Sequence, residues 1–580
     1  MTTALQIAGP QQLVREVRSQ LASGHAAPGT DDYFRAWADW CLGLALAPEK
    51  QLALAQSAFA LGADTWRFAL QAATGRTMVP ATDDAQFTGA GWNRWPFNLY
   101  AHGYSHLKQW SAQALQAAAG MSGENAQRLE FLQRQWLNAA SPAHYLATNP
   151  QLLEQTHAEG GANLLRGAQH WLVDAARMIA GGAAPGTEHF RVGEQVAITP
   201  GKVVMRNELA ELIQYSPQTE TVHPEPILIT PAWIMKYYIL DLSPHNSLVQ
   251  YLVGQGYTVF MLSWRNPTAA DRNLGMDDYV RLGLHAALDA VNVIVPGKRI
   301  HAVGYCIGGT LLALGAAARA RQGDTRIGSI TLFAAQTDFS EPGELALFIS
   351  PNQLATLEAQ MQRDGVLKSE SMGAAFALLR GADLIWAPAV NQYLRGKRAP
   401  LNDLMAWNAD GTRMPCRMHS EYLKRLYLHN ELATGRFTVA NEPVDLKQLT
   451  VPMFVVGTET DHVAPWRSAF KTRALTRSAD FSFVLTSGGH NAGIISGPVN
   501  PKRRHRVFHW TDAAAAASPE QFLDGAQLHA GSWWPTWERW LAARSTPATA
   551  PATATPPPPM GNAAAGYPPL CDAPGGYVRG

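Results

Sequence analysis

The chain has 580 residues, with 47 lysines and arginines against 46 aspartates and glutamates, so its net charge is +1. Charged residues make up only 16% of it, against about 25% in an average soluble protein. This balance excludes the basic excess of a general nucleic-acid binder, and the length predicts more than one domain. The four cysteines have no C-x-x-C spacing, which argues against a disulfide framework or a zinc-finger-type site.

Residues 1–190 are predicted to form a helical N-terminal domain. Asp31 or Asp32 can cap a helix that runs through Trp40, and Pro48 suits the first position of a second helix that ends at Ala73. A third helix is indicated by apolar residues that recur on one face: Leu164, Ala168, Trp171 and Ala175. The start lacks the pattern of a secretory signal, and no apolar run reaches about 18 residues. We therefore expect a cytoplasmic protein without a membrane span.

Residues 191–545 are predicted to form an α/β domain with a mostly parallel, doubly wound sheet. Short β-branched runs alternate there with helical runs, which is typical of a sheet covered by helices on both faces. The expected strands are 227–230, 258–264, 300–305, 327–334, 453–457 and 481–485. The expected crossover helices are 247–254, 276–295 and 307–321.

Two segments depart from this rhythm. Between about residues 340 and 445 the sequence is mostly helical, so we expect an insertion over the strand ends, either as a lid or as a passive addition. Residues 546–580 begin with a Pro/Ala/Thr-rich run, which predicts a linker and tail outside the packed core.

A nucleophile is predicted at Cys306. It follows a buried strand and precedes a helix, within the segment Gly304-Tyr305-Cys306-Ile307-Gly308. This G-x-C-x-G form of a nucleophile elbow needs glycine because side chains two residues either side of the cysteine would collide. The helix N-terminus would also favour the thiolate.

The partners of Cys306 are expected downstream, in the order acid and then base. Asp461 lies in the loop after the strand 453–457, and His490 lies in the glycine-containing loop after the strand 481–485. His490 would take the thiol proton, and Asp461 would hold the imidazole. Asp338, after the strand 327–334, is an alternative acid, and His462 is a candidate assistant.

An oxyanion hole needs two backbone N–H donors. The first is expected at Ile307, directly after the nucleophile. The second is expected in the loop after the strand 227–230, at Ala232 or Trp233.

Several segments together resemble polyhydroxyalkanoate synthases of class I. They are KYYILDL (236–242), SWRNP (263–267), GYCIGG (304–309), WNADGTRMP (407–415), GTETDHVAPW (457–466), SGGHNAG (487–493), GSWWPTW (531–537) and APGGYV (573–578). RWPFNLY (94–100) and TNPQLL (148–153) extend the likeness into the N-terminal region. The resemblance implies an α/β-hydrolase fold with a Cys306–Asp461–His490 triad.

The resemblance further implies an activity and partners. Such enzymes polymerise (R)-3-hydroxyacyl-CoA, here expected to be 3-hydroxybutyryl-CoA, into storage polyester. Coenzyme A is part of the substrate and a product, so no separate cofactor or metal is expected. It also implies association with cytoplasmic polyester granules and a homodimer in the active state. Trp407 corresponds to a tryptophan linked to dimerisation, and Met235 stands where asparagine is common.

The chemistry agrees with this resemblance. Exchange of a CoA thioester for an enzyme thioester is nearly isoenergetic, and the acyl-cysteine stays reactive toward a hydroxyl. Water must be excluded, which the insertion would do as a lid. In that insertion Arg395, Lys397 and Arg398 form a basic trio that either meets CoA phosphates or is a solvated surface.

Two other functions remain open. Cysteine hydrolases of the dienelactone hydrolase type also carry a G-Y-C-x-G-G elbow, but they are far smaller. A non-catalytic granule-associated protein could keep the fold, although a complete triad argues against it. Insoluble polyester as the product would indicate a synthase, and soluble hydroxy acid would indicate a hydrolase.

Overall fold

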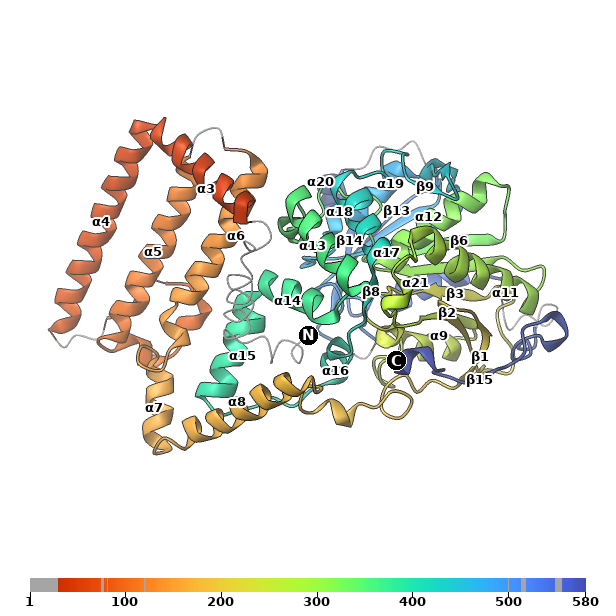
Figure 1. Ribbon diagram of the computed structural model, residues 1–580, viewed down its shortest axis with the longest axis horizontal. Coiled ribbons are helices and arrows are strands. Elements are labelled where there is room, and N and C mark those ends of the chain that lie inside the picture. Colours follow the sequence, from red (N-terminus) through yellow and green to blue (C-terminus); the bar gives the residue numbers. More distant parts are fainter. Residues whose placement is uncertain are drawn as a thin grey trace. The chain divides into compact units, whose positions relative to one another are not determined.

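The computed structural model describes residues 30–74, 78–80, 82–118, 121–498, 500–512, 518–547 and 555–580. The chain divides into two compact units (Figure 1). Of the described residues, those up to 185 and residues 373–401 make up the helical unit, and those of 186–372 and 402–580 make up the α/β unit. The first change of unit lies between Pro185 and Gly186, whereas the sequence analysis places the boundary after residue 190.

The helical unit consists mainly of α-helices. Its main elements are α3 (Thr30–Ala45), α4 (Pro48–Ala73), α5 (Phe97–Ala117), α6 (Gly123–Ala140), α7 (Pro150–Ala158) and α8 (Ala162–Ala180). Pro48 is the first residue of α4, as predicted. Helix α3 starts at Thr30, so Asp31 and Asp32 lie in its first turn rather than at its cap, and it continues beyond Trp40. Helices α4 and α5 lie side by side in Figure 1.

The residues 373–401 pack on α8 within this unit. They include η9 (Ala382–Trp386), α15 (Ala387–Ala389) and η10 (Val390–Leu394). A Cβ on Gly167 would lie 1.8 Å from the carbonyl oxygen of Tyr393, so only glycine allows this approach. Asn163 Nδ2 donates to the Leu394 carbonyl at 2.8 Å. The helix predicted from Leu164, Ala168, Trp171 and Ala175 is confirmed as α8, and its buried residues are the small or polar Asn163, Gly167 and Asp174.

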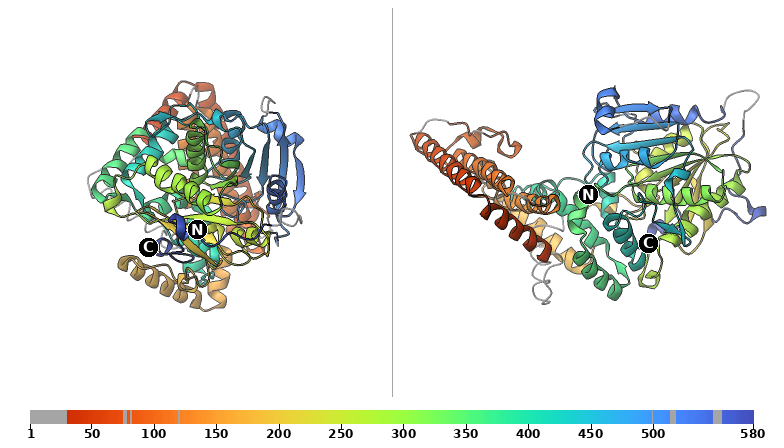
Figure 2. Two further views of the ribbon diagram at one scale, coloured as in Figure 1. Left: turned by 90° about the vertical axis from the view of Figure 1, so that its right-hand side faces the viewer. Right: turned by 90° about the horizontal axis from the view of Figure 1, so that it is seen from above.

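The α/β unit contains a sheet in the order β14-β13-β12-β11-β6-β5-β3-β4-β2-β1-β15. Its strands are β1 (Gly201–Arg206), β2 (Ala210–Tyr215), β3 (Ile227–Thr230), β4 (Val259–Trp264), β5 (Ile300–Tyr305), β6 (Ile327–Phe333), β11 (Met453–Thr458), β12 (Phe481–Thr486), β13 (Arg504–Trp510), β14 (Gln527–Ala530) and β15 (Cys571–Asp572). Strands β4 to β12 in this order are parallel, and those outside them are antiparallel. Figure 2 shows the late strands, in blue, side by side.

All six predicted strands are present, with ends that differ by at most one residue. The crossover helices are also as expected: α9 (Leu248–Gly254), the run α10 (Met276–Asp278), η7 (Tyr279–His285) and α11 (Ala286–Ile294), and α12 (Ile307–Arg321). Sequence reasoning missed the hairpin of β1 and β2 and the strands β13, β14 and β15. Strand β13 reads RHRVFHW, and its many polar residues hide it.

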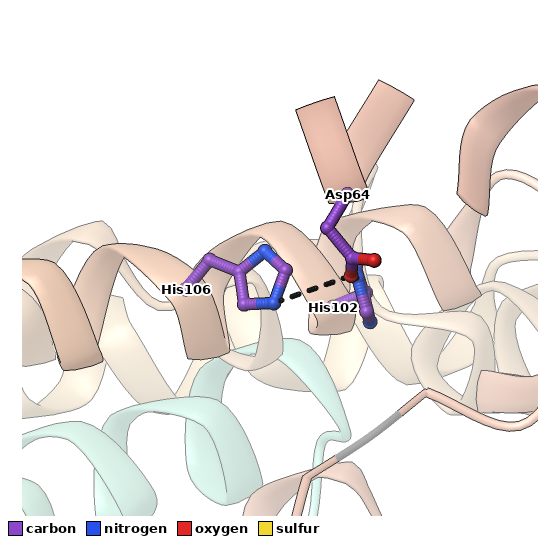
Figure 3. Close-up of side chains that lie close together, drawn as sticks. All are labelled: Asp64, His102 and His106. Atoms are coloured by element: carbon purple, nitrogen blue, oxygen red, sulfur yellow. Dashed lines mark hydrogen bonds and ion pairs between the residues drawn. The ribbon is translucent and has the colours of Figure 1, made fainter. Parts of the chain in front are cut away.

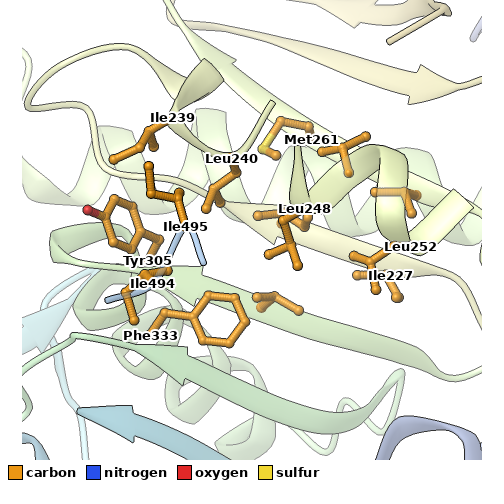
Figure 4. Close-up of a cluster of buried hydrophobic side chains, with 14 of the residues drawn as sticks. Ile227, Ile239, Leu240, Leu248, Leu252, Met261, Tyr305, Phe333, Ile494 and Ile495 are labelled. Atoms are coloured by element: carbon orange, nitrogen blue, oxygen red, sulfur yellow. The ribbon is translucent and has the colours of Figure 1, made fainter. Parts of the chain in front are cut away.

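A continuous apolar core joins the sheet to its helices (Figure 4). It includes Ile227 on β3, Met261 on β4, Phe333 on β6 and Leu248 and Leu252 on α9, each with no exposed surface. Strands β2, β3, β4, β5, β11 and β12 are buried at every position. Such burial on both faces fixes the strand register, and with it the positions of the loops at the strand ends.

The segment 340–445 is not one body. Its middle part, 373–401, belongs to the helical unit, while its two ends pack on the α/β unit. These ends hold α13 (Pro351–Asp364), β7 (Val366–Leu367), α16 (Asp403–Ala409), β8 (Met414–Pro415), α17 (Cys416–Glu421) and η11 (Tyr422–Leu428), while α14 (Ser369–Leu379) crosses from one unit to the other. Strands β7 and β8, which precede and follow residues 373–401 in the chain, pair with each other in antiparallel orientation.

Residues 555–580 also differ from the expected loose tail. Strand β15 pairs with β1 and extends the sheet. The buried carboxylate of Glu211 accepts hydrogen bonds from the backbone N–H groups of Gly576 and Tyr577, both at 3.0 Å. A proline-rich segment can hold its place without a core of its own because its backbone pairs with an existing sheet edge.

In the described ranges, no single helix is long and apolar enough to cross a membrane; one pair, Ser369–Leu379 with Ala382–Leu394, meets that test only jointly and is bent by 113°.

Candidate active site

Cys306 lies on the sharp turn between β5 and α12. Its backbone has φ 55° and ψ −130°, a strained conformation for a residue with a side chain. A Cβ on Gly304 would lie 2.4 Å from the backbone of the first turn of α12. One on Gly308 would lie 2.4 Å from the carbonyl oxygens of Thr230 and Pro231. The structure thus confirms that no side chain fits two residues either side of Cys306.

His490 lies in the loop after β12, and tryptophans hold this loop in place. Trp533 Nε1 donates to the Gly493 carbonyl at 3.0 Å, and Trp534 Nε1 donates to the Ile494 carbonyl at 2.9 Å. Trp534 begins helix α21 (Trp534–Ala542), which packs into the main core. These indoles therefore position the histidine in addition to packing the core.

Asp461 follows β11 and faces the histidine. Its Oδ2 atom accepts hydrogen bonds from His490 Nδ1 at 2.8 Å and from Thr458 Oγ1 at 3.1 Å. Its Oδ1 atom accepts from the backbone N–H groups of Val463 and Ala464 at 2.9 and 2.8 Å. The carboxylate side chain has no exposed surface, so these four donors fix it as an acceptor.

The histidine is poised between two groups that can carry negative charge. Burial alone would lower the pKa of His490, but the charges of Asp461 and Cys306 and hydrogen bonds to both side chains outweigh it. They hold the pKa of His490 well above its ordinary value. Because Nδ1 is bonded to Asp461, Nε2 is the atom left to face Cys306. The structure therefore brings together the three residues that the sequence singled out.

Two backbone segments meet at the nucleophile. Ile307 is the first residue of α12, so its N–H has no partner inside the helix. The close approach of Gly308 to Thr230 and Pro231 brings the loop after β3 to the same helix end. In that loop Trp233 is buried. Its ring nitrogen and its carbonyl already make hydrogen bonds, so its backbone N–H is the group that can act as the second donor.

The loop after β3 is hydrogen-bonded to Thr412 and Met418, which follow residues 373–401 in the chain. Trp233 Nε1 donates to Met418 Sδ at 3.0 Å. Thr412 Oγ1 donates to the Trp233 carbonyl at 2.7 Å and accepts from the Met235 backbone N–H at 2.8 Å. Met235 has φ 73°, in the left-handed region that asparagine tolerates better than methionine. This accounts for the asparagine expected at that position.

Sequence reasoning missed two buried tyrosines whose pKa values respond to the charge of Cys306. Tyr422 and Tyr427 lie on η11, both are buried, and their hydroxyl oxygens are 3.3 Å apart. Burial raises the pKa of both phenols, and the charge of Cys306 adds to the rise. Phe339 packs against Tyr427 with ring centroids 4.9 Å apart. The only signal was an aromatic pair five residues apart, which an ordinary helix does not place on one face.

The alternative acid has a different task. Asp338 Oδ1 accepts hydrogen bonds from the Ser340 backbone N–H at 2.7 Å and from Asn430 Nδ2 at 3.0 Å. Burial would raise the pKa of Asp338, but these bonds and nearby Lys471 lower it. Asp461, not Asp338, is the carboxylate on His490. In the described part of the chain, no hydrogen bond or ion pair joins the His462 side chain to Asp461 or His490.

The basic trio lies in the helical unit and is largely engaged there. Arg398 Nη2 lies 2.8 Å from both carboxylate oxygens of Asp174, whose side chain is 3% exposed. Arg395 Nη2 donates to Gln151 Oε1 at 3.0 Å, whereas Lys397 is exposed. Whether the trio meets CoA phosphates therefore stays a prediction, and Arg398 already has a buried carboxylate as its partner.

Trp407 does not present its ring on the surface of the α/β unit. It is 4% exposed, belongs to the main core, and donates from Nε1 to the Lys236 carbonyl at 2.7 Å. Lys236 Nζ in turn forms an ion pair with Asp410 at 2.8 Å. The link of Trp407 to dimerisation stays a prediction, and within its own chain the ring is a packed core residue.

Known proteins give the same assignment as the architecture. Residues 225–495 match the family model of the alpha/beta hydrolase fold, which agrees with the sheet order and the elbow at Cys306. The molecule is therefore a member of the α/β-hydrolase superfamily with a helical addition. Residues 83–252 match the model described as poly-beta-hydroxybutyrate polymerase (PhaC) N-terminus.

Relatives that match most of this chain identify the family within the superfamily. A poly(3-hydroxyalkanoate) polymerase of Methylorubrum extorquens is 40% identical, over 92% of this chain and 87% of the relative. The poly(3-hydroxyalkanoate) polymerase subunit PhaC of Rhizobium meliloti is 36% identical, over 92% and 88%. That of Cupriavidus necator is 37% identical, over 86% and 83%. The chain belongs to the poly(3-hydroxyalkanoate) polymerase family.

Proposed function

We propose that this chain polymerises (R)-3-hydroxyacyl-CoA, with 3-hydroxybutyryl-CoA as the expected monomer, through an acyl-cysteine at Cys306. The observation that carries the proposal is the hydrogen-bonded series from Asp461 through His490 to Cys306 on a strained elbow. Family membership supports the polymer as product, and the triad supports covalent catalysis.

The first half of the cycle moves the acyl group to the enzyme. His490 Nε2 takes the thiol proton, and Cys306 Sγ attacks the thioester carbonyl carbon. The N–H groups of Ile307 and Trp233 stabilise the oxyanion of the tetrahedral intermediate. The carbon–sulfur bond to coenzyme A then breaks, and the leaving thiolate receives the proton from His490. Asp461 stabilises the imidazolium throughout.

The second half extends the ester. His490 removes the proton of a 3-hydroxyl group on another hydroxyacyl unit, whose oxygen attacks the acyl-cysteine. The carbon–sulfur bond to Cys306 breaks, the thiol is restored, and the new ester is one unit longer. Tyr422 and Tyr427, with Phe339 packed on Tyr427, favour transfer to this hydroxyl rather than to water, because their buried aromatic rings would limit the access of water.

The product also has a matching surface. Large exposed apolar side chains are concentrated in the helical unit, among them Phe34, Phe59, Trp66 and Leu165, each at least 65% exposed. Such a surface fits contact with a hydrophobic polyester, which supports localisation on granules in the cytoplasm. A homodimer as the active state remains part of this proposal.

The decisive test measures product and nucleophile together. Purified protein is incubated with (R)-3-hydroxybutyryl-CoA, with CoA release followed by chromatography and polymer by turbidity. Both signals should vanish in Cys306→Ala and persist in Cys416→Ala, a control cysteine on α17. CoA release with only soluble 3-hydroxybutyrate would instead establish a thioesterase. Activity unchanged in Cys306→Ala would refute the acyl-cysteine.

A further inference from the structure

Far along the chain from the triad, the helical unit brings two histidines and an aspartate together (Figure 3). Asp64 lies on α4, while His102 and His106 lie one turn apart on α5. One ligand atom from each lies within 4.8 Å of the other two. His102 Nε2 is 3.1 Å from Asp64 Oδ2, and His106 Nε2 is 3.7 Å from the same oxygen.

These separations suit one shared cation. Zinc binds imidazole nitrogen and carboxylate oxygen at about 2.0–2.1 Å, so tetrahedral ligand atoms lie about 3.3–3.4 Å apart. The two measured separations, 3.1 and 3.7 Å, fall on either side of this value. Small side-chain rotations would therefore suffice to place an ion between the three atoms. Two imidazoles and a carboxylate are also a donor set that divalent zinc and its neighbours prefer.

The hydrogen bonds of Thr65 determine which nitrogen of His106 is available. The Thr65 hydroxyl has one hydrogen, and it donates that hydrogen to the Leu61 carbonyl at 2.8 Å. The same oxygen lies 2.8 Å from His106 Nδ1, so it accepts a hydrogen bond from that nitrogen. Because Nδ1 is engaged with Thr65, Nε2 is the nitrogen of His106 that faces the Asp64 carboxylate.

His102 is the buried member of the cluster. Its side chain is 5% exposed and stacks on Phe68, with ring centroids 4.1 Å apart. Its Nδ1 atom has no hydrogen-bond partner in the described residues. Asp64 also meets Arg67 at 3.5 Å, but through Oδ1, which leaves Oδ2 to the histidines.

We propose that Asp64 Oδ2, His102 Nε2 and His106 Nε2 bind a divalent transition-metal ion of the zinc type. Water would complete its coordination, because the Asp64 side chain is 48% exposed. Thr65 acts as a positioning residue that holds His106 by its second nitrogen, as outer hydrogen bonds commonly do for metal-binding histidines. The ion would join α4 to α5 and so stabilise the helical unit. This site is independent of the proposed catalytic function.

The test uses the full chain, freed of metal with a chelator, and Co²⁺ as a spectroscopic substitute for zinc. Equilibrium dialysis should find one ion per chain at this site, with visible absorption typical of nitrogen and oxygen ligands. His106→Ala and Asp64→Asn should each remove that ion, whereas His157→Ala, an exposed histidine on α7, should not. A Cys306→Ala background removes any contribution from the catalytic thiol. Equal stoichiometry in all variants, or no bound ion in the wild type, would overturn the proposal.

A second comparison guards against a variant that simply fails to fold. Thr65→Val keeps the size of the side chain but removes the acceptor for His106 Nδ1, so Co²⁺ affinity should fall about 10–100-fold. Thr65→Ser should restore it. Circular dichroism should show unchanged helix content in both. A Thr65→Val variant that binds as tightly as the wild type would contradict the positioning role.

Discussion

The two units of this molecule are stabilised in different ways. The α/β unit has a large apolar core in which strands pack against α9 and α21, and its central strands are buried at all positions. Among the described residues, the helical unit buries small clusters, such as the one around Phe87 and Trp92, and leaves many large apolar side chains exposed. Its packing on α8 relies on a glycine and on polar contacts.

We expect the α/β unit to be the more rigid of the two and the helical unit to be the more easily deformed. Cys306 and Asp461 are positioned by backbone that a continuous core holds rigid, as catalysis requires. The helical unit has fewer buried apolar contacts, so its elements should open at lower free energy than the core strands. Exposed aromatic surface and lower local stability suit contact with an amorphous hydrophobic product.

The largest effect is expected for Asp461→Asn in the rigid unit. The change keeps the shape but removes the charge that stabilises imidazolium at His490, so kcat should fall about 10⁴-fold. Asp338→Asn is the matched control, because that carboxylate bonds Ser340 and Asn430 instead. CoA release measures both. Equal losses in the two variants would mean that the acid has been misassigned.

The same variant has a pH signature. The pKa of His490 in the folded protein lies above its unfolded value of about 6.5. Its proton-linked stabilisation is therefore complete below that pH and is lost as pH rises through the raised pKa. Asp461→Asn lowers the pKa of His490, so its melting temperature should decline less on going from neutral to alkaline pH. Thermal scans of both proteins check this slope.

The next largest effect is expected for Asp174→Ala in the helical unit. It leaves Arg398 without its buried partner, which should cost about 3 kcal/mol. The loss should be local, and limited proteolysis should cut residues 373–401 before the α/β unit. Asp383→Ala, which removes an exposed pair with Arg380 on the same segment, should change stability by about 0.5 kcal/mol or less. Simultaneous unfolding of both units would refute the difference in stability.

Replacing a glycine by alanine should destabilise the α/β unit at one position and stabilise the helical unit at another. Gly308→Ala would place a Cβ 2.4 Å from two carbonyl oxygens at the elbow, so we expect a loss of about 1–3 kcal/mol and of acylation. Gly62→Ala on α4 meets nothing within 4 Å and should stabilise its helix by about 0.5–1 kcal/mol. Denaturant melts measure both. A neutral Gly308→Ala would mean that the elbow is less crowded than the structure shows.

The smallest effect concerns Met235, whose φ is 73°. Met235→Asn should stabilise the α/β unit by about 1 kcal/mol, because asparagine adopts this left-handed conformation at lower cost. Met235→Ala retains the backbone penalty and serves as the control. Calorimetric melting temperatures distinguish them. An equal gain in both variants would attribute the effect to the side chain rather than to the backbone.

Much of the catalytic region could be predicted from the sequence. Buried strands such as 300–305 have a clear apolar pattern, and the chain order of Cys306, Asp461 and His490 follows the strand order. Local glycines then reveal the elbow because only they satisfy its close contacts. These features are encoded by residues near one another in the sequence.

The rest depended on pairings between distant residues. Asp174 with Arg398, and Gly167 with Tyr393, join segments more than 200 residues apart through contacts that have no apolar pattern. Tyr422 and Tyr427 lie on the π-helical turn η11, which sequence periodicity does not reveal. The four-residue spacing of His102 and His106 is visible in the sequence, but the sequence does not show that Asp64, on another helix, lies next to them.

Strand β15 has a consequence for how the protein survives in a crowded cell. It covers the edge of β1, which would otherwise present unpaired backbone groups to any passing strand. Its pairing covers only two residues, and prolines precede it, so it offers little edge of its own for further strand addition. A chain lacking residues 555–580 would keep Glu211 buried without its two backbone donors. Such a truncation is expected to yield insoluble aggregates of the enzyme itself rather than a shorter working polymerase.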